Sequence, residues 1–339
     1  FNPKIVVIDE TTTALSQEGR EELYKHMERI RKSGNTVIFI SHDLPEIIEK
    51  SDTITILRDG VYIDTVKSKD VNENDLKKLM VGREVTGDYY RSDYGEKVSD
   101  EVVLSVKDVT VPGLIENVSF DLHKGEILGF GGLSESGMHE IGKAIFGASY
   151  DREGTVELAD GTQINDIPTA IKHSIAYTSK DRDNESVVLN QSIGDNICLP
   201  SLDELSGPAH LISDKKKKDF ANKFAKQMSV KMVDVNQFVS NLSGGNKQKV
   251  VLARWIGKDS DIVVLDSPTR GIDIKVKQDI YQLMNQMRKN GKSIIMISEE
   301  LMELIGMCDR IMIMKDGKIS GELERDQNLD ENGLITMMV

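Results

Sequence analysis

The sequence predicts an α/β fold built around a parallel sheet, with one partial and one complete copy of the same unit along the chain. Three observations lead to this prediction. A stretch near the N-terminus recurs further along, each copy alternates strand-like and helix-like segments, and the first strand of each copy ends in an aspartate. Alternating strands and helices indicate βαβ units and therefore parallel strands.

The repeat is long and contains no gaps. Residues 5–60 align with residues 262–317 at a constant offset of 257, and roughly a third of the aligned positions are identical. The match predicts the end of one domain followed by a complete second copy. We therefore expect a partial first domain in residues 1–85, a linker in residues 86–101 and a complete second domain in residues 102–339.

Each copy opens with a short apolar run that ends in aspartate, a pattern typical of a buried parallel strand. A helical stretch closed by glycine and a second apolar strand follow. The expected strands and helices are, in chain order, residues 5–9, 17–32, 36–40, 262–266, 275–289 and 293–297. Ligands of such sheets bind at the carboxyl ends of strands, where Asp9 and Asp266 stand.

The expected linker is polar, rich in turn residues and without a period. It contains Tyr89, Tyr90 and Tyr94. Docking of these rings on a neighbouring surface is one possibility, but loosely packed loop aromatics are favoured, because connecting segments usually run over the protein surface.

Composition excludes several classes of protein. The chain of 339 residues has 39% hydrophobic and 29% charged residues, as ordinary globular domains do. It contains no run of 18 apolar residues, no signal-peptide pattern at its start, and only two cysteines. A net charge of −13 argues against nucleic acid as a partner. The run Lys215–Lys218 is interpreted as a solvated helix face.

A glycine-containing motif at residues 242–249, Leu-Ser-Gly-Gly-Asn-Lys-Gln-Lys, precedes the second copy of the repeat. A serine before two glycines at a helix start presents backbone N–H groups and a hydroxyl at the positive end of the helix, which favours anions. The alternative is a simple helix cap by Ser243. The motif alone does not decide between the two.

Together these motifs resemble those of ATP-binding cassette proteins, above all the twin-cassette ATPase subunit of bacterial monosaccharide importers of the ribose, galactose and xylose type. The resemblance rests on residues 242–249, the Asp-Ser-Pro-Thr-Arg-Gly-Ile-Asp run at 266–273, the segment 80–84 and Asp181-Arg182. It implies a P-loop NTPase-like cassette with a parallel sheet and helices, an antiparallel β subdomain and a helical subdomain. The first copy would be truncated at its N-terminus.

In that family a signature motif, which corresponds to residues 242–249 here, closes from one cassette over ATP held by the other. The resemblance therefore implies that Ser243, Gly244 and Gly245 contact the γ-phosphate of a nucleotide on the first cassette. Asp9 would hold Mg²⁺ through water, Glu10 would be the general base, and His42 would orient the γ-phosphate and the attacking water. The plainer readings are helix capping for Asp9 and Glu10, and a structural histidine for His42.

The second copy departs from the motif that a phosphate-binding loop requires, G-x-x-x-x-G-K-[ST]. The spacing of Gly132 and Gly137 is right, but Met138 and His139 replace the lysine and the hydroxyl. The expected second site also contains Asp266, at the end of its strand. Three further members differ from active cassettes: Lys180, Ser267 in place of the catalytic glutamate, and Glu299 in place of the histidine. We therefore expect this second site to be degenerate and unable to hydrolyse ATP.

By the repeat, the glycine loop of the first copy would lie about 130 residues before Asp9, outside this chain. The intact parent is thus expected to be an ABC-type ATPase with ATP and Mg²⁺ as cofactors, and this chain alone to be inactive. The expected partners are membrane permease subunits, the N-terminal part of the first cassette and, indirectly, a periplasmic or extracellular sugar-binding protein. The expected location is cytoplasmic, at the inner face of the membrane.

Two other functions remain as alternatives. A cytosolic twin-cassette factor acting on ribosomes would need a glutamate after the strand-end aspartate in both copies, and Ser267 stands there in the second. A nucleotide-sensing pseudo-ATPase or scaffold fits the missing parts of both sites. Restored hydrolysis in a completed first cassette, lost on Glu10→Gln, distinguishes the ATPase from the scaffold.

Overall fold

The computed structural model describes residues 3–9, 11–15, 17–41, 43–58, 61–81, 89–94, 96–207, 211–326 and 329–338. The chain divides into two compact units, one formed by residues 1–88 and 273–275 and the other by residues 89–272 and 276–339. The α/β fold class is confirmed, because strands and helices alternate in both units and the main strands pair in parallel.

In the first unit a two-stranded parallel sheet is joined by a long helix, as the repeat predicts. Strands β1 and β2 pair so that Asp9 lies opposite Ile40. A helical segment and an antiparallel hairpin of β3 and β4 follow. The elements are β1 (Ile5–Asp9), η1 (Thr11–Ala14), α1 (Gln17–Lys32), β2 (Thr36–Ile40), α2 (Leu44–Lys50), β3 (Thr53–Arg58), β4 (Val61–Lys67), η2 (Ser68–Asp70) and α3 (Glu73–Val81).

The second unit is built on a six-stranded sheet in the order β13-β12-β7-β11-β10-β9. Its strands are parallel except β13, which pairs antiparallel with β12. The strand bounds are β7 (Ile127–Gly132), β9 (Ile175–Thr178), β10 (Ile262–Asp266), β11 (Ser293–Ile297), β12 (Arg310–Lys315) and β13 (Lys318–Glu324). Every residue of β7, β10 and β11 is buried, which explains their unbroken apolar runs.

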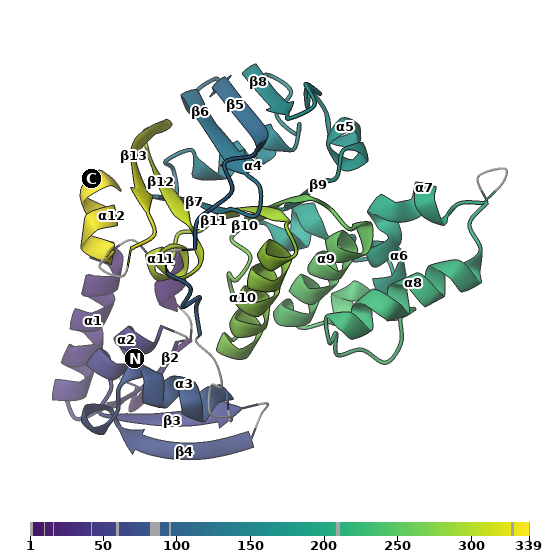
Figure 1. The fold of residues 1–339 in the computed structure, drawn as a ribbon. Helices are drawn as coiled ribbons and strands as arrows, with labels where there is room; N and C mark the ends of the chain where they lie inside the picture. The colour runs from purple at the N-terminus through teal and green to yellow at the C-terminus, as the bar shows by residue number, and fades with distance from the viewer. Residues whose placement is uncertain are drawn as a thin grey trace. The chain divides into compact units, whose positions relative to one another are not determined.

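Two smaller layers accompany this sheet, and Figure 1 shows them on separate sides of it. One is a three-stranded antiparallel sheet of β5 (Val102–Val111), β6 (Ile115–His123) and β8 (Glu153–Leu158). The other is helical and contains α6, α7, α8 and α9. The helix bounds are α4 (Met138–Ile145), α5 (Ile167–Lys172), α6 (Ile193–Cys198), α7 (Leu202–Leu205), α8 (Asp214–Gln227), α9 (Gly244–Lys258), α10 (Ile274–Lys289), α11 (Leu301–Met307) and α12 (Glu331–Met338).

The strand pair at the heart of the repeat has the same register in both units. Asp266 lies opposite Ile297 in the second unit, as Asp9 lies opposite Ile40 in the first. The burial of the two pairs differs. Ile297 is fully buried, whereas the side chain of Ile40 is 45% exposed. In the second unit α4 covers this face, because Gly142 of α4 packs directly against Ile297.

The expectation of loosely packed tyrosines before β5 is wrong for Tyr89 and Tyr90, whereas Tyr94 is 42% exposed. Tyr89 packs edge-on and Tyr90 at a tilt against the buried ring of Tyr281, with ring centroids 5.4 and 5.3 Å from it. A Cβ atom on Gly306 of α11 would lie 2.3 Å from Cγ of Tyr90, so glycine makes room for the ring. The guanidinium of Arg325 lies 4.5 Å from the ring centroid of Tyr94. Sequence patterns do not reveal these partners, because they come from segments about 190 to 235 residues away.

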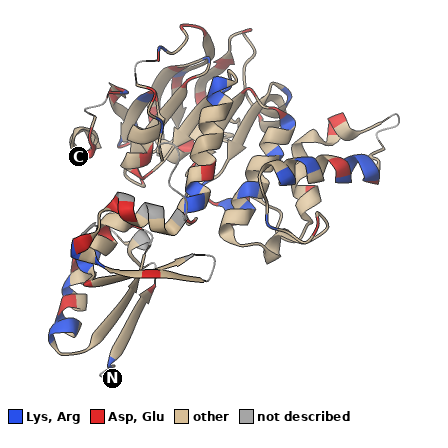
Figure 2. Cartoon of the chain, turned by 60° about the horizontal axis from the view of Figure 1, so that its bottom comes forward, with Lys and Arg blue, Asp and Glu red and all other residues tan. Residues whose placement is uncertain are grey.

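The lysine run of α8 is a solvated helix face, as predicted. Lys215, Lys216 and Lys218 are exposed, and Lys217 pairs with Asp195. Figure 2 shows segments with Lys and Arg and segments with Asp and Glu interspersed along the ribbon of the second unit, whereas the four consecutive lysines of α8 stand together. Among the helices that the structure describes, none is long and apolar enough to cross a membrane.

Candidate functional site

The glycine loop of the second unit forms a tight turn between β7 and α4. Gly137, at the start of α4, has φ of +91°, and a Cβ there would lie 2.6 Å from Cγ2 of Ile115. A Cβ on Gly132 would lie 2.7 Å from the carbonyl oxygen of Met314. The loop therefore needs both glycines. Met138 is completely buried, so its side chain belongs to the core and offers no charge to the loop.

His139, one residue further along α4, is held by the aspartate at the end of β10. Its Nδ1 lies 2.7 Å from Oδ1 of Asp266, and Nδ1 donates because a carboxylate only accepts. Asp266 is 1% exposed, and its other oxygen accepts from the hydroxyl of Tyr177 at 3.4 Å. The buried carboxylate thus has its partners within the protein.

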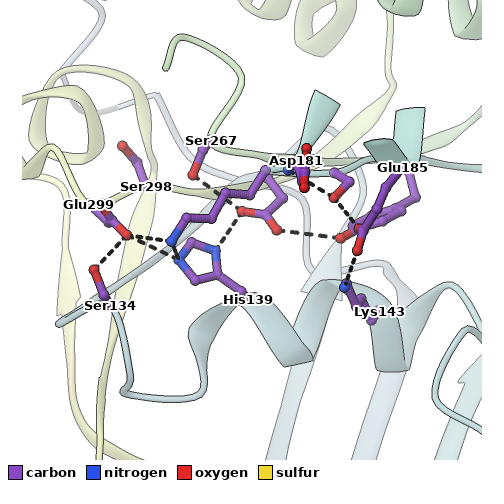
Figure 3. A network of polar contacts seen from close by, with 12 residues as sticks. Ser134, His139, Lys143, Asp181, Glu185, Ser267, Ser298 and Glu299 are labelled. Atoms are coloured by element: carbon purple, nitrogen blue, oxygen red, sulfur yellow. Dashed lines mark hydrogen bonds and ion pairs between the residues drawn. The ribbon is translucent and has the colours of Figure 1, made fainter. Parts of the chain in front are cut away.

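Glu299 joins the same network from the segment that follows β11 (Figure 3). Its Oε1 accepts from Nζ of Lys180 at 2.7 Å and from the hydroxyl of Ser134 at 2.9 Å. Nε2 of His139 lies 3.1 Å from Nζ of Lys180 and 3.4 Å from Oε1 of Glu299. A neutral His139 accepts from Lys180 at this nitrogen, whereas a protonated one donates to Glu299.

These contacts shift the pKa values of both groups. Burial by itself lowers the pKa of His139, but the hydrogen bonds to Asp266 and Glu299 outweigh it and raise the pKa to about 8. The hydrogen bond from His139, together with those from Lys180 and Ser134, holds the pKa of Glu299 well below its usual range. At neutral pH this region therefore contains a protonated imidazole and an ionised carboxylate in contact.

The raised pKa of His139 makes the stability of the second unit pH-dependent. Because the folded pKa of about 8 lies above the reference value of 6.5, the stabilisation is fully present below pH 6.5 and is lost as the pH rises through 8. The expected loss is about 2 kcal/mol. Urea unfolding monitored through Trp255, the single tryptophan of the sequence, measures it at pH 6 and pH 9. His139→Gln should flatten this dependence, and an unchanged slope in that variant would contradict the assignment.

Ser267 follows Asp266 at the place where the first copy has Glu10. Its backbone is in the left-handed region with φ of +48°, and its N–H donates to the carbonyl oxygen of Ile297 at 2.8 Å. Its hydroxyl lies 3.3 Å from Oδ1 of Asp266. A serine in this position provides no carboxylate to accept a proton from water.

A cavity of about 680 Å³ opens beside this network. Its walls carry charges of both signs. The cations are Lys143, Lys180, Arg182 and Arg270, and the carboxylates include Asp181, Asp183 and Glu185. Lys143 donates to Glu185 at 2.8 Å, so part of this charge is neutralised internally. The cavity has the size and the cations to take an anionic ligand, but its electrostatic attraction for one is reduced.

The residues of this site do not fit a magnesium ion. Mg²⁺ binds through oxygen ligands at about 2.0–2.1 Å and keeps several waters. Here the imidazole of His139 occupies the approach to Asp266, and the ammonium of Lys180 lies against Glu299. Within the described ranges no group of three His, Cys, Asp or Glu side chains is arranged to hold a metal ion. By contrast, Asp9 presents an exposed carboxylate at the end of β1.

The signature segment begins α9 at Gly244. The hydroxyl of Ser243 makes no capping hydrogen bond to the helix and instead accepts from Nδ2 of Asn246 at 2.9 Å. Ser243 is exposed and Gly244 lies beside Arg182, which lines the cavity. This geometry disfavours the simple capping reading and leaves the hydroxyl accessible.

The structure thus brings the predicted residues of the second site together around one network. The network contains His139, Lys180, Asp266, Ser267 and Glu299. Gly132 and Gly137 belong to the adjoining loop, whereas the side chain of Met138 lies in the core. Glu10 and His42 lie outside the described residues. Sequence reasoning missed Ser134, Tyr177 and the pair of Lys143 and Glu185. Two features of the sequence could have indicated them. Ser134 lies inside the glycine loop, and Tyr177 is next to Thr178 at the end of β9.

Comparisons with known proteins indicate what the chain is similar to. The family model described as ABC transporter matches residues 115–270. Ribose import ATP-binding protein RbsA of Clostridium tetani is 38% identical over 329 residues, which cover 97% of this chain and 65% of that protein. Xylose import ATP-binding protein XylG of Thermoanaerobacter pseudethanolicus is 43% identical over 333 residues, or 96% of this chain and 66% of that protein. The chain therefore spans about two-thirds of the length of these curated relatives.

Two solved structures show the same fold. A dimeric ATP-binding cassette in a post-hydrolysis state, bound to ADP and Pi, aligns with a TM-score of 0.58 at 22% identity. The alignment covers 66% of this chain and 99% of that one. A nucleotide-free ATP-binding cassette from an ABC transporter aligns with a TM-score of 0.59 at 18% identity, over 70% of this chain and 99% of that one.

Proposed function

We propose that this chain, which carries an ATP-binding cassette of the ABC transporter family, is part of the subunit that couples ATP hydrolysis to the import of a monosaccharide. The observation that carries the proposal is the similarity to sugar import ATP-binding proteins, which runs through both units of the chain. The cassettes of such a subunit supply energy and do not select the sugar, so the proposal names a substrate class only.

In this proposal the subunit has two cassettes, of which the chain contains the end of the first and the whole of the second. The gapless repeat supports it, and so does the difference in burial between the copies. Ile5 and Val7 of β1 are 59% exposed, whereas their equivalents Ile262 and Val264 are 4% and 0% exposed. In the second copy α4 covers this face of the sheet. A partial copy that lacks the equivalent helix would leave the same face exposed, as the first copy does.

The hydrolytic site would be composite. Asp9 would hold Mg²⁺ through water, and the ion would neutralise phosphate charge. Glu10 would accept a proton from the attacking water, and His42 would donate a hydrogen bond to the γ-phosphate. Ser243, Gly244 and Gly245 would close over the same phosphate with backbone N–H groups and a hydroxyl. The exposed hydroxyl of Ser243 at the start of α9 supports this last role.

The second copy would not hydrolyse ATP. Its network holds Asp266 and Glu299 with His139 and Lys180 instead of with a metal ion, and Ser267 replaces the base. Loss of a general base alone costs roughly two to four orders of magnitude in rate. We assign this copy the role of providing the signature that completes the first site.

The partners that follow are membrane permease subunits, the N-terminal part of the first cassette and, indirectly, an extracytoplasmic sugar-binding protein. The subunit would lie in the cytoplasm, bound peripherally to the inner face of the membrane. A nucleotide-sensing scaffold is the second candidate, and the internally paired second site is the observation that favours it.

Hydrolysis by the natural polypeptide that includes the first glycine loop tests the proposal. We expect Mg²⁺-dependent ATPase activity that Glu10→Gln lowers by about 10²- to 10⁴-fold. The matched control is Glu21→Gln, which alters an exposed glutamate of α1 and should leave the rate unchanged. Absence of hydrolysis in the wild-type protein, or equal activity in Glu10→Gln, would favour the scaffold.

A further inference from the structure

A buried glutamate occurs at the same place in both copies of the repeat. Glu46 lies in the first turn of α2 and Glu303 in the first turn of α11, and they are 6% and 1% exposed. A buried carboxylate is costly unless hydrogen bonds satisfy it. The hydrogen-bond donors to these two carboxylates therefore show which segments of the chain each glutamate holds together.

In the second copy the carboxylate of Glu303 joins the segments that follow two neighbouring strands. Oε2 accepts from the hydroxyl of Ser298 at 2.9 Å, just after β11, and Oε1 accepts from that of Thr269 at 2.5 Å, just after β10. The hydroxyl of Tyr281 also donates to Oε1, and Nζ of Lys277 lies 3.4 Å from it.

The first copy repeats this arrangement with the equivalent residues. Oε2 of Glu46 accepts from Ser41 at 2.8 Å and from Thr12 at 3.1 Å. The hydroxyl of Tyr24 donates to Oε1. In each copy, therefore, the hydroxyls of a serine, a threonine and a tyrosine at equivalent positions of the repeat donate to the equivalent glutamate.

The hydroxyl donors stand next to the positions that matter for hydrolysis. Ser41 directly precedes His42, and Thr12 comes two residues after Glu10. The serine hydroxyl also accepts from the N–H of Asp43 at 3.1 Å, so the residues on both sides of His42 are tied to the glutamate. A single carboxylate therefore joins the segment that follows β1 to the segment that follows β2, and in the sequence these two segments contain Glu10 and His42.

We infer that Glu46 is a positioning residue of the composite ATP site, which fixes the general base and the γ-phosphate-orienting histidine relative to each other. The inference rests on the proposed function. Glu46 contacts neither nucleotide nor water in this role, and it acts through Thr12 and Ser41. A displacement of about 1 Å at a reacting group costs as much as 10²-fold in rate, so a loosened pair of loops should mainly reduce kcat.

Glu46→Gln in the full natural polypeptide tests the inference. The amide keeps the shape of the side chain but has one acceptor oxygen in place of two, so at least one of the three hydroxyls can no longer donate to it. We expect kcat to fall by about 10- to 100-fold with KM unchanged. The matched control is Glu303→Gln, which removes the same contacts in the copy that lacks the base, and there kcat should change less than about 2-fold.

Single-donor variants keep the test valid if Glu46→Gln folds poorly. Ser41→Ala and Thr12→Val should each lower kcat, whereas Ser298→Ala and Thr269→Val should not. An equal effect of the two glutamate variants on kcat, or a change confined to KM, would overturn the inference. Wild-type protein that shows no hydrolysis dependent on Glu10 would instead count against the proposed function.

Hydrogen exchange of the 339-residue chain provides a readout that needs no ATPase activity. Glu46→Gln should accelerate amide exchange in the segments after β1 and after β2 together, because one carboxylate holds both. Glu303→Gln should do the same after β10 and β11. Unchanged exchange, or acceleration in one segment only, would show that the glutamate does not couple the loops.

Discussion

Arg91→Met is expected to destabilise the second unit by about 3–5 kcal/mol, because it leaves the charge of Asp309 buried without its partner. Arg91 is 4% and Asp309 9% exposed, and their side chains meet at 2.6 Å. Arg91 also donates to the carbonyl oxygen of Met307 at 2.8 Å. The other oxygen of Asp309 accepts from the N–H of Ile127 at 2.8 Å, so the pair fastens residue 91 to the start of β7.

Guanidinium unfolding monitored through Trp255 measures this loss. The matched control is Lys124→Met, because the pair of Lys124 and Glu101 has both side chains more than half exposed. Exposed pairs of this kind contribute 0–1 kcal/mol, and the control should therefore be nearly neutral. A loss below about 1 kcal/mol in Arg91→Met would show that Asp309 finds another partner or water.

Ile297→Ala is expected to cost about 2–5 kcal/mol, whereas the equivalent change in the first unit, Ile40→Ala, should cost well under half of that. The side chain of Ile297 is completely buried beneath Gly142 of α4, so its removal leaves a cavity. Ile40 is 45% exposed and loses less transfer free energy. The two variants change the same residue type at the same position of the repeat.

Hydrogen exchange followed by mass spectrometry gives the free energy of opening for β2 and β11 separately, which is necessary because the two units need not unfold together. A similar loss in both strands would mean that the face of β1 and β2 is covered in solution. Concentration dependence of the β2 result would then identify self-association as the cause.

The parts of the fold that follow from local patterns were predictable. Patterns of spacing along the sequence indicate the strand ends at Asp9 and Asp266 and the glycine-rich turn at Gly137. The alternation of strands and helices likewise indicates parallel pairing. The matched glutamates were visible too, since Glu46 and Glu303 are identical positions of the repeat, but a glutamate in an amphipathic helix is normally a surface residue. Only the hydroxyls around each carboxylate distinguish these two from the others.

Long-range contacts set the limit of prediction. His139 and Lys180 were recognised as departures from an active cassette, but their motifs do not indicate that the two side chains meet each other and Glu299. The docking of Tyr90 depends on a space left by Gly306, more than 200 residues away. Such pairings arise from packing of the sheet and helices and have no local periodicity.

The ion network of the second unit also determines what it would cost to introduce the residues of a phosphate-binding loop there. His139→Thr alone would leave buried Asp266 without its nearest donor, and Met138→Lys alone would place an ammonium in a completely buried space. A glutamate at position 267 would add a third carboxylate to a cluster whose cations are already engaged. Each of these single substitutions is therefore expected to lower the stability of the second unit, so the pattern of a phosphate-binding loop would have to be introduced at several positions together.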